Sequence, residues 1–357
     1  MALHSLFVQN LRIIEQLDIS LAADANLFVG ENGAGKTSIL EAIDILSRGR
    51  SFRERRTQPL LGNHAENLIV RSQLTSQEGP ILLGIQKSAR QTELRCNQEK
   101  VASISNHAAY LPVVSMHPDS HQLIQGGGKQ RRTYLDWSTF HVKPGFLQDW
   151  RAYNKCLKQR NQALRDQCSP AELEVWTKEL STKAELVDRE RLCVFNEIMP
   201  YFDEYSRSLL PECELNIHYH RGWPEETSLQ ESLTEALSQE RNSKTTRLGA
   251  HRADLKLFFN QQEAAATASR GQQKLIAACL LLAQIKHLQQ HEGQKCVVLL
   301  DDIRAELDQQ HASALMSALQ ALGCQVFITA IEEQQVEIKG WENTAVFHVK
   351  QGICERE

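Results

Sequence analysis

One stretch of the sequence has the residue types and the spacing that suit the binding of a phosphate chain. Residues 30–37, GENGAGKT, fit the pattern G-x-x-x-x-G-K-[ST], in which glycines let backbone N–H groups face phosphate oxygens. We expect the Lys36 ammonium to reach the β- and γ-phosphates and the Thr37 hydroxyl to bind Mg²⁺. The predicted nucleotide-binding residues of this stretch are Gly30, Glu31, Asn32, Gly33, Ala34, Gly35, Lys36, Thr37 and Ser38.

Two carboxylates follow a strongly apolar segment nearer the other end of the chain. Residues 296–300, CVVLL, predict a buried strand, and Asp301 and Asp302 come directly after it. Ligands bind at the carboxyl ends of strands in α/β sheets, so this pair is expected beside the phosphates. We expect Asp301 to bind Mg²⁺ and Asp302 to orient or deprotonate the attacking water. The candidate catalytic residues are therefore Lys36, Asp301 and Asp302, and the candidate metal ligands are Thr37 and Asp301.

Each of these motifs also has a simpler interpretation. A glycine turn arises by chance, and an acidic pair after a strand is more often a helix cap or a turn. Their occurrence in one chain favours a nucleotide site. The N-K-x-D element that reads guanine is missing, because Asn154-Lys155 is followed by Cys156 and Leu157. Adenine is favoured, and ATP is the expected nucleotide.

A third segment is suited to binding an anion at the tip of a helix. Ser269 precedes a long apolar helical pattern and can cap it, while Gly271 would let a phosphate approach the backbone. By itself this is only a capped helix. Its position gives it weight, because it lies about 30 residues before Asp301 and because Glu306-Leu307-Asp308 follows that residue.

The composition is that of a globular protein. The 357 residues suggest two or three structural units, and the 41% of hydrophobic residues exclude disorder as the main state. Lys+Arg 40 against Asp+Glu 44 gives a net charge of −4, so no domain carries one dominant sign. The nine cysteines include no C-x-x-C pair, which excludes zinc ribbons. We expect a cytoplasmic protein without a membrane span or signal peptide.

Short apolar runs alternate with helical patterns at both ends of the chain. Strands are predicted at residues 6–8, 12–14 and 27–29, followed by a helix over 38–46. Residues 67–114 predict a mostly antiparallel sheet without a strong helix signal. Near the C-terminus, helices are predicted over 272–290 and 309–322, and continuous apolar strands over 296–300 and 324–330. Continuous apolar strands are typical of a buried parallel sheet.

The middle of the chain changes to helical spacing. Apolar residues about 3.5 positions apart predict two antiparallel helices, from Phe146 to Cys168 and from Leu173 to Tyr205, with Pro170 suited to a first helical position. The pair forms either a protruding arm or lid, or an ordinary helical subdomain. The expected organisation is an α/β head made of residues 1–145 and 246–357, interrupted by a helical arm/lid domain of residues 146–245.

The order of these motifs resembles that of the ABC-type (SMC/Rad50-like) P-loop ATPase heads, in which a signature segment precedes the acidic strand. Two further segments, GGGKQRRTYLD at 126–136 and TRLGAHRAD at 246–254, are similar to motifs of the RecF family of bacterial recombination mediators. Gly128 and Ala250 stand where that family usually has proline. The likeness spans nearly the whole chain and implies an ABC-type head with an inserted helical domain.

This resemblance also implies a mechanism. Ser269, Gly271 and Asp308 of one chain would close over the phosphates held by a second chain, so that ATP drives a homodimer. Asp302 stands where many such proteins have glutamate, which suggests slow hydrolysis that releases the dimer. The chain would then be a weak, DNA-stimulated ATPase used as a switch. The implied partners are gapped DNA with single-strand/duplex junctions and RecR, with RecO and RecA in the same pathway.

Three basic clusters are candidates for DNA contact. They lie at residues 48–56, 129–132 and 155–160, and each is explained equally well as a solvated charged face. The predicted DNA-binding residues are Arg53, Arg55, Arg56, Arg131, Arg132, Lys155 and Lys158. Arg50 and Arg53 could instead contact ATP phosphate. No recognition helix or zinc finger is evident, so little sequence preference is expected. The alternative function is an ABC-type ATPase subunit that acts on another partner complex.

Overall fold

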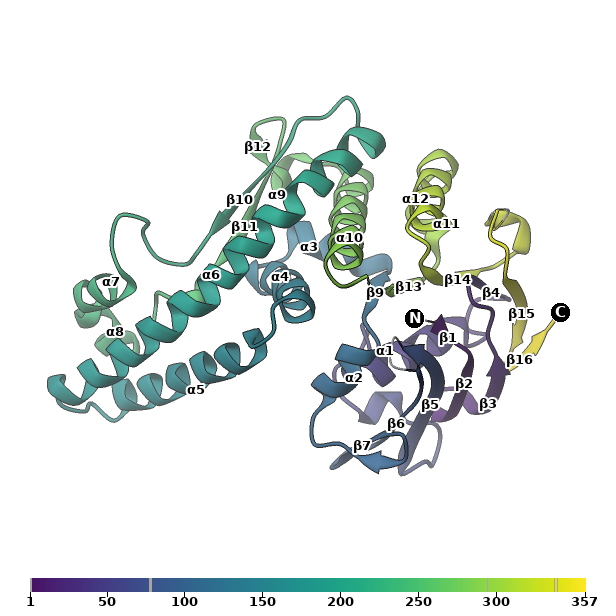
Figure 1. Cartoon of the computed structure of the whole chain (residues 1–357), viewed down its shortest axis with the longest axis horizontal. Helices are drawn as coiled ribbons and strands as arrows, with labels where there is room; N and C mark the ends of the chain where they lie inside the picture. The colour runs from purple at the N-terminus through teal and green to yellow at the C-terminus, as the bar shows by residue number, and fades with distance from the viewer. Residues whose placement is uncertain (1, 77–78, 294, 337, 339) are drawn as a thin grey trace. The chain divides into compact units, whose positions relative to one another are not determined.

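The computed structural model describes residues 2–76, 79–293, 295–336, 338 and 340–357, without the side chains of residues 292, 305 and 306 (Figure 1). The chain forms two compact units. One unit comprises Met1–Ser120 and Leu280–Glu357, and the other comprises His121–Cys279. The first unit therefore combines both ends of the chain.

A largely parallel sheet forms the centre of the first unit. Its strands are β4 (Ala25–Val29), β9 (Val113–Met116), β13 (Val297–Leu300), β14 (Gln325–Ala330), β15 (Thr344–Lys350) and β16 (Ile353–Arg356). Their order is β16-β15-β4-β14-β13-β9, and β16 runs antiparallel to β15. β4 pairs in parallel with β14 and β15, and β13 pairs in parallel with β14 and β9. The two apolar strands predicted near the C-terminus are confirmed, and the parallel strands end at one common edge.

A second sheet of the first unit is antiparallel. It has the order β3-β2-β5-β6-β7-β8, with β1 beside β5. The strands are β1 (Ala2–Leu3), β2 (Ser5–Leu11), β3 (Ile14–Ser20), β5 (Asn67–Ser76), β6 (Gly79–Ser88), β7 (Thr92–Cys96) and β8 (Glu99–Lys100). Residues along β5 alternate between buried and more exposed positions, as in a sheet with one face in the core.

The structure corrects the sequence interpretation at three places in this region. Arg12 and Ile13 form the turn between β2 and β3, and Arg12 takes a left-handed conformation there with φ 54°. Residues 104–110 form helix α2 (Ile104–Tyr110), whose N-terminus is capped by the Ser103 hydroxyl. The run at Val113–Met116 leaves the antiparallel sheet and pairs with β13, because its residues are buried among apolar neighbours.

Helix α1 (Lys36–Arg48) packs against strands of both sheets and joins them in one apolar core. Within this core the Phe28 ring stacks against Phe347 and Phe327, with ring centroids 5.0 and 6.5 Å apart. The predicted helix over 38–46 is therefore confirmed. The other predicted helices are α10 (Arg270–Glu292), which begins in the second unit, and α12 (Gln309–Ala321), which follows the short α11 (Ile303–Glu306).

Two long helices dominate the second unit. They are α5 (Phe146–Arg165) and α6 (Pro170–Leu209), which lie side by side (Figure 1). Pro170 is the first residue of α6, and the hydroxyl of Ser169 accepts a hydrogen bond from the backbone N–H of Glu172 at 3.3 Å. Tyr153 of α5 and Val187 of α6 belong to one buried cluster. The predicted helix pair is confirmed.

Smaller elements complete this unit. They are α3 (Gln122–Gln125), α4 (Gly128–Val142), β10 (Leu215–His220), α7 (Leu229–Glu235), α8 (Leu237–Ser243), β11 (Asp254–Phe259), β12 (Gln262–Glu263) and α9 (Ala264–Thr267). In the described part of the chain, 3₁₀ turns lie at Gln58–Leu60, Pro118–His121, Ala250–Arg252 and Glu333–Gln335, of which Ala250–Arg252 lies wholly in this unit. β10 and β11 pair antiparallel over their whole length.

The second unit extends beyond the segment 146–245 that the sequence sets apart. Arg191 of α6 donates a hydrogen bond to Asp136 of α4 at 2.7 Å and another to the carbonyl of Ala250 at 2.6 Å. These buried contacts explain why residues 121–145 and 246–279 cluster with the helix pair. No sequence pattern placed the unit boundaries at residues 120 and 279, because the contacts join positions far apart in the chain.

Candidate nucleotide-binding site

The loop after β4 has the curled backbone that a phosphate cradle requires. Gly35 has φ 113°, a left-handed conformation that side chains other than glycine rarely adopt, and it precedes the first turn of α1. A Cβ atom on Gly30 would lie 2.2 Å from the carbonyl oxygen of Val349. The backbone N–H of Gly352 donates to the carbonyl of Ala34 at 2.8 Å. The turn between β15 and β16 therefore braces the loop, a contribution that the sequence analysis missed.

Lys36 is the first residue of α1, directly after this loop, and is nearly buried, with 9% of its surface exposed. Its ammonium donates to the carbonyl oxygens of Gly30 at 2.5 Å and Glu31 at 2.9 Å. Burial lowers the pKa of Lys36, against the charges of Asp302 and Asp301, which raise it. The cation is thus held over the loop by backbone groups and two nearby carboxylates, where a phosphate would meet it.

Asp301 meets the phosphate loop directly, although the two lie 264 residues apart in the chain. The Thr37 hydroxyl donates to the carboxylate of Asp301 at 2.8 Å. The Thr329 hydroxyl at the end of β14 donates to the same oxygen at 2.9 Å, and the backbone N–H of Asp301 donates to the carbonyl of Met116 at 2.9 Å. Burial raises the pKa of Asp301, while the two hydroxyl bonds and the charge of Arg53 lower it.

Thr329 was not predicted as part of the site. The backbone N–H of Asp302 donates to its hydroxyl at 2.8 Å, so Thr329 orients both aspartates. The available signal was a polar residue near the end of the apolar strand 324–330, at the edge where ligands bind.

Asp302 directly precedes α11 as its N-cap residue and has a left-handed conformation, with φ 52° and ψ 50°. Aspartate tolerates this region better than most residues, but the conformation still costs energy and is typical of sites where geometry serves function. Asp301 is buried, with 6% of its surface exposed, whereas Asp302 is half-buried. The two acidic side chains therefore occupy different environments one residue apart.

The predicted anion site at the start of α10 has a well-formed cap. The Ser269 hydroxyl accepts from the backbone N–H of Gln272 at 3.3 Å, and the Gln272 side chain accepts from the backbone N–H of Ser269 at 2.9 Å. This reciprocal pair is a capping box, and it confirms that Ser269 caps the helix. Gly271 is exposed, and a Cβ atom there would meet nothing within 4 Å.

Asp308 also serves as a helix cap. Its carboxylate accepts from the backbone N–H of His311 at 3.0 Å, and its second oxygen lies 2.6 Å from the Nδ1 atom of the same residue. The backbone bond from His311 lowers the pKa of Asp308, which is exposed. The side chain of Glu306 lies outside the described residues. The predicted part of Asp308 in a second chain's site stays a prediction.

Comparison with known proteins identifies the family. The model of the RecF/RecN/SMC N terminal domain matches residues 2–355. The DNA replication and repair protein RecF of Thioalkalivibrio sulfidiphilus (strain HL-EbGR7) is 41% identical over 354 residues, which cover 99% of this chain and 98% of the relative. The chain belongs to the RecF family.

Further RecF proteins and solved structures agree. RecF of Vibrio vulnificus (strain CMCP6) is 35% identical over the full length of both chains. The solved structure of the recombination mediator protein RecF-ATP in the RecFOR pathway has a TM-score of 0.89 at 25% identity and covers 100% of this chain and 97% of that chain. An Smc head bound to a domain of ScpA has a TM-score of 0.61 at 13% identity over 100% of this chain and 97% of that chain, and shows the fold. The predicted ABC-type head fold is confirmed.

The two RecF-like motif segments contact each other in the second unit. Arg131 of the first segment donates to the carboxylate of Asp254 in the second at 2.7 and 3.0 Å, and Arg132 donates to the carbonyl of Ala253 at 2.6 Å. A Cβ atom on Gly128, where the RecF family usually has proline, would lie 3.0 Å from Asp254. The segments are therefore two halves of one structural junction.

These contacts change how the predicted DNA-binding residues are interpreted. Arg131 is 9% exposed, and its guanidinium also donates to three backbone carbonyls, those of Leu123, Ile124 and Gly126. A guanidinium engaged in this way has little capacity left for a DNA phosphate, and Arg132 is half-buried. Arg160, from the third basic cluster, is fully buried. The sequence cannot distinguish such arginines from solvated ones.

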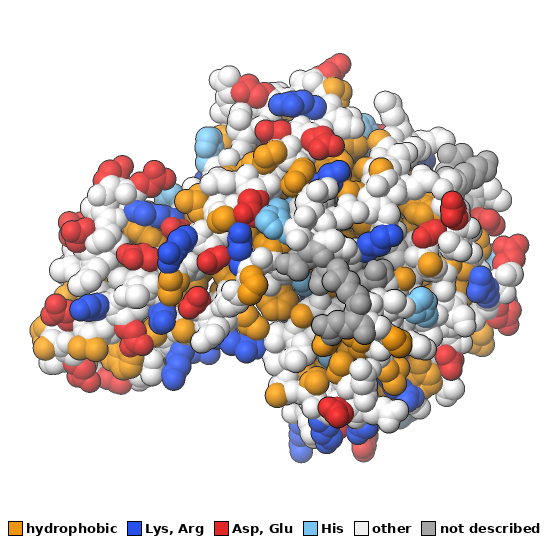
Figure 2. Space-filling view, viewed as in Figure 1, with side chains coloured by type: hydrophobic (Ala, Val, Ile, Leu, Met, Phe, Trp, Pro, Cys, Tyr) orange, Lys and Arg blue, Asp and Glu red, His pale blue; other side chains and the backbone are white. Residues whose placement is uncertain are grey.

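The remaining basic candidates are accessible. Arg53, Arg55 and Arg56 are exposed, as are Lys155 and Lys158 on α5. Arg56 lies 3.5 Å from the carboxylate of Glu54. Basic and acidic side chains are interspersed on the face drawn in Figure 2, in keeping with the net charge of −4. Any DNA contact made there must therefore depend on local clusters.

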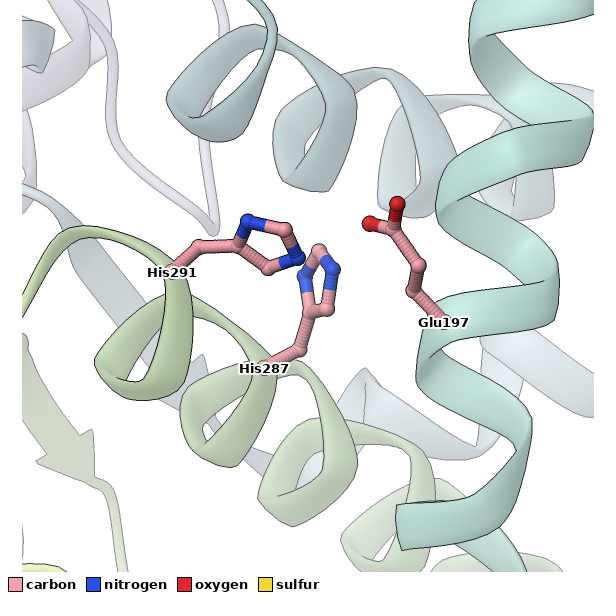
Figure 3. Close-up of side chains that lie close together, drawn as sticks. All are labelled: Glu197, His287 and His291. Carbon is pink, nitrogen blue, oxygen red and sulfur yellow. The ribbon is translucent and has the colours of Figure 1, made fainter.

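Three histidines that the mechanism leaves aside, His251, His287 and His291, have clear positions. His251 is bonded through Nδ1 to the Tyr153 hydroxyl at 2.7 Å, and burial lowers the pKa of His251 to about 4, which favours a structural role. His287 and His291 lie one turn apart on α10 with ring centroids 4.7 Å apart (Figure 3). Glu197, also drawn there, accepts from the Lys143 ammonium at 3.0 Å within the second unit.

None of the helices in the described part of the chain is long and apolar enough to cross a membrane.

Proposed function

We propose that this chain is an ATP-dependent DNA-binding protein of recombinational repair and replication-fork maintenance. ATP binding joins two chains on single-strand/duplex junctions at DNA gaps, and slow hydrolysis separates them. The chain acts with RecR and RecO to load RecA. Its relatives are named as DNA replication and repair proteins, and one solved relative is a RecF-ATP complex of the RecFOR pathway. A cytoplasmic location fits this role and stays a prediction.

The hydrogen bond between Thr37 and Asp301 is the observation that carries the nucleotide part of this proposal. It joins the end of a phosphate loop to the acidic end of β13, and Lys36 lies beside both. The hydroxyl and carboxylate oxygens are the ligand types that Mg²⁺ takes in nucleotide sites, so Thr37 and Asp301 would hold the ion, which would neutralise phosphate charge. The half-buried Asp302 is the residue proposed to orient the attacking water.

With the phosphates in the loop, the nucleotide base would lie beside the apolar side chain of Ile13. A Cβ atom on Gly35 would lie 3.3 Å from Ile13, which shows that the two residues are in close contact. Ile13 is 46% exposed, and an exposed isoleucine beside a phosphate loop offers a surface for a base to cover. This contact lacks hydrogen-bonding groups of its own, so it would hold a base by apolar contact without distinguishing adenine from guanine.

The second half of each ATP site would come from another chain. The capped start of α10 presents Ser269 and Gly271 on an exposed helix tip, and the open space around Gly271 leaves room for a phosphate oxygen. Asp308 would approach the same nucleotide from its helix cap. Two such sites related by twofold symmetry make ATP the link between the chains.

Light scattering tests this arrangement. We expect one chain of 40.5 kDa without nucleotide or with ADP, and a particle of twice that mass with ATP. A Lys36→Arg chain should stay monomeric under all conditions, because a guanidinium does not reproduce the compact ammonium. A Ser269→Arg chain should bind ATP normally without dimerising. An oligomer that forms without ATP, or a monomer saturated with ATP, would contradict the proposal.

DNA binding should depend on charge more than on sequence. Lys155 and Lys158 are exposed three residues apart on α5, so they lie on one face of the helix. Replacing both with glutamine should weaken binding equally on unrelated sequences and reduce the slope of log affinity against log salt by about 2. The matched control replaces Lys178 and Lys244, which are also exposed. Equal effects of the two double variants in a filter-binding titration would reject this surface.

A further inference from the structure

The segment after α1 contains three exposed arginines, and its first residue is buried. We call residues 51–56 the arginine loop, since it contains Arg53, Arg55 and Arg56. Ser51 at its start is buried, with 3% of its surface exposed. The three arginines themselves are exposed. The loop is thus anchored at one point and open along the rest of its length.

A buried carboxylate forms the anchor. Glu41 of α1 is fully buried, and its two oxygens accept from the Arg12 guanidinium at 2.5 and 2.7 Å. One of these oxygens also accepts from the Ser51 hydroxyl at 2.5 Å. A buried charge costs several kcal/mol unless it is paired and hydrogen-bonded, so these partners hold one another in place. Arg12 belongs to the β2–β3 turn, which makes the anchor a junction of three segments.

Ser51 also forms hydrogen bonds with the backbone of the arginine loop. Its hydroxyl oxygen accepts from the backbone N–H of Arg53 at 2.9 Å and from that of Glu54 at 3.3 Å. The hydroxyl donates to Glu41, so one side chain serves as donor and as acceptor. Loss of this hydroxyl would remove three hydrogen bonds at once and free the start of the loop.

A second contact places the loop at the edge of the parallel sheet where Asp301 lies. The Phe52 ring stacks on His117 with centroids 4.9 Å apart. His117 follows β9, and the preceding Met116 carbonyl accepts from the backbone N–H of Asp301 at 2.9 Å. Arg53 directly follows Phe52 in the chain, so this contact holds the Arg53 backbone near the sheet edge at which Asp301 lies.

We propose that Ser51, held by Glu41, is a positioning residue that aims Arg53 at the phosphates of ATP. This inference rests on the proposed function. It separates the arginines of the loop into two groups: Arg53 serves the nucleotide, whereas Arg55 and Arg56 remain available to DNA. The alternative is that Ser51 only fills space under the loop, in which case its removal would lower stability without a specific effect on Arg53.

Limited proteolysis tests the anchoring without any nucleotide. Trypsin should cut within the arginine loop about fivefold faster in Ser51→Ala than in the wild type, because the open form of the loop becomes more populated. Ser51→Thr retains the hydroxyl and should cut at the wild-type rate. Ser47→Ala is the matched control, since Ser47 of α1 is also buried and its hydroxyl donates to the Leu111 carbonyl. Equal cutting in Ser51→Ala and Ser47→Ala would overturn the anchoring.

A double-mutant cycle tests the link to Arg53. Ser51→Ala should lower kcat/KM for ATP hydrolysis about fivefold, and Ser51→Thr should restore it. In an Arg53→Ala background, Ser51→Ala should have no further effect. Independent effects of the two changes would overturn the positioning role. A wild-type chain that neither binds nor hydrolyses ATP would reject the proposed function and with it the role of Arg53, while the trypsin result would still report whether Ser51 anchors the loop.

Discussion

Replacing Lys36 with alanine should lower the affinity for ATP about 100-fold, the size expected when a charge-assisted hydrogen bond to a phosphate is lost from a nearly buried site. The ammonium is held by the carbonyls of Gly30 and Glu31 and by the charges of Asp301 and Asp302. Its removal leaves two carboxylates beside the phosphates without the compensating cation. Titration with a fluorescent ATP analogue in the presence of Mg²⁺ measures the change.

The matched control is Lys87→Ala. Lys87 lies in the same unit, and its half-buried ammonium also donates to a backbone carbonyl, that of Gly49. Burial lowers the pKa of Lys87 as it does that of Lys36, so the two residues differ mainly in position. We expect Lys87→Ala to bind ATP like the wild type. If both variants lose affinity equally, a general loss of stability explains the effect and the phosphate role of Lys36 is wrong.

Replacing Arg160 with methionine should destabilise the second unit by about 3–5 kcal/mol, because one partner of a buried ion pair is removed. The guanidinium is fully buried and donates to Glu240 at 2.7 Å, Thr246 at 2.9 Å and Thr177 at 3.0 Å. Without it, the Glu240 carboxylate stays buried with the backbone N–H of Arg247 as a partner. Urea denaturation followed by circular dichroism measures the loss.

Two companion variants make this result specific. Arg165→Met lies on the same helix, where Arg165 is exposed and bonds to Gln162, and it should change the free energy of unfolding by less than about 0.5 kcal/mol. Changing Arg160 and Glu240 together to methionine should recover part of the stability, since no charge is then left buried. Equal stability of the Arg160→Met and Arg165→Met chains would contradict the buried pair. If the folded Arg160→Met chain binds DNA with the affinity of the wild type, Arg160 does not belong to the DNA-binding surface.

Much of the candidate site was readable from the sequence because its parts are local. The curl of the loop at residues 30–37 depends on glycines within eight positions, and the cap at Ser269 depends on a glutamine three residues later. The helix after Pro170 and the apolar strand before Asp301 follow from periodicity in short windows. Short-range patterns of this kind determine local structure independently of how distant parts of the chain fold.

Tertiary structure decided which of those local groups meet. The sequence alone did not show that Thr329 would join Asp301 or that Ser51 would reach Glu41, because hydroxyl groups carry no signal of their partner. It ranked Arg131 with solvated arginines, although Asp254, more than a hundred positions away, buries it. Side-chain type and local period set the backbone of each element, whereas burial and pairing of polar groups depend on contacts between distant segments, which only the folded chain brings together.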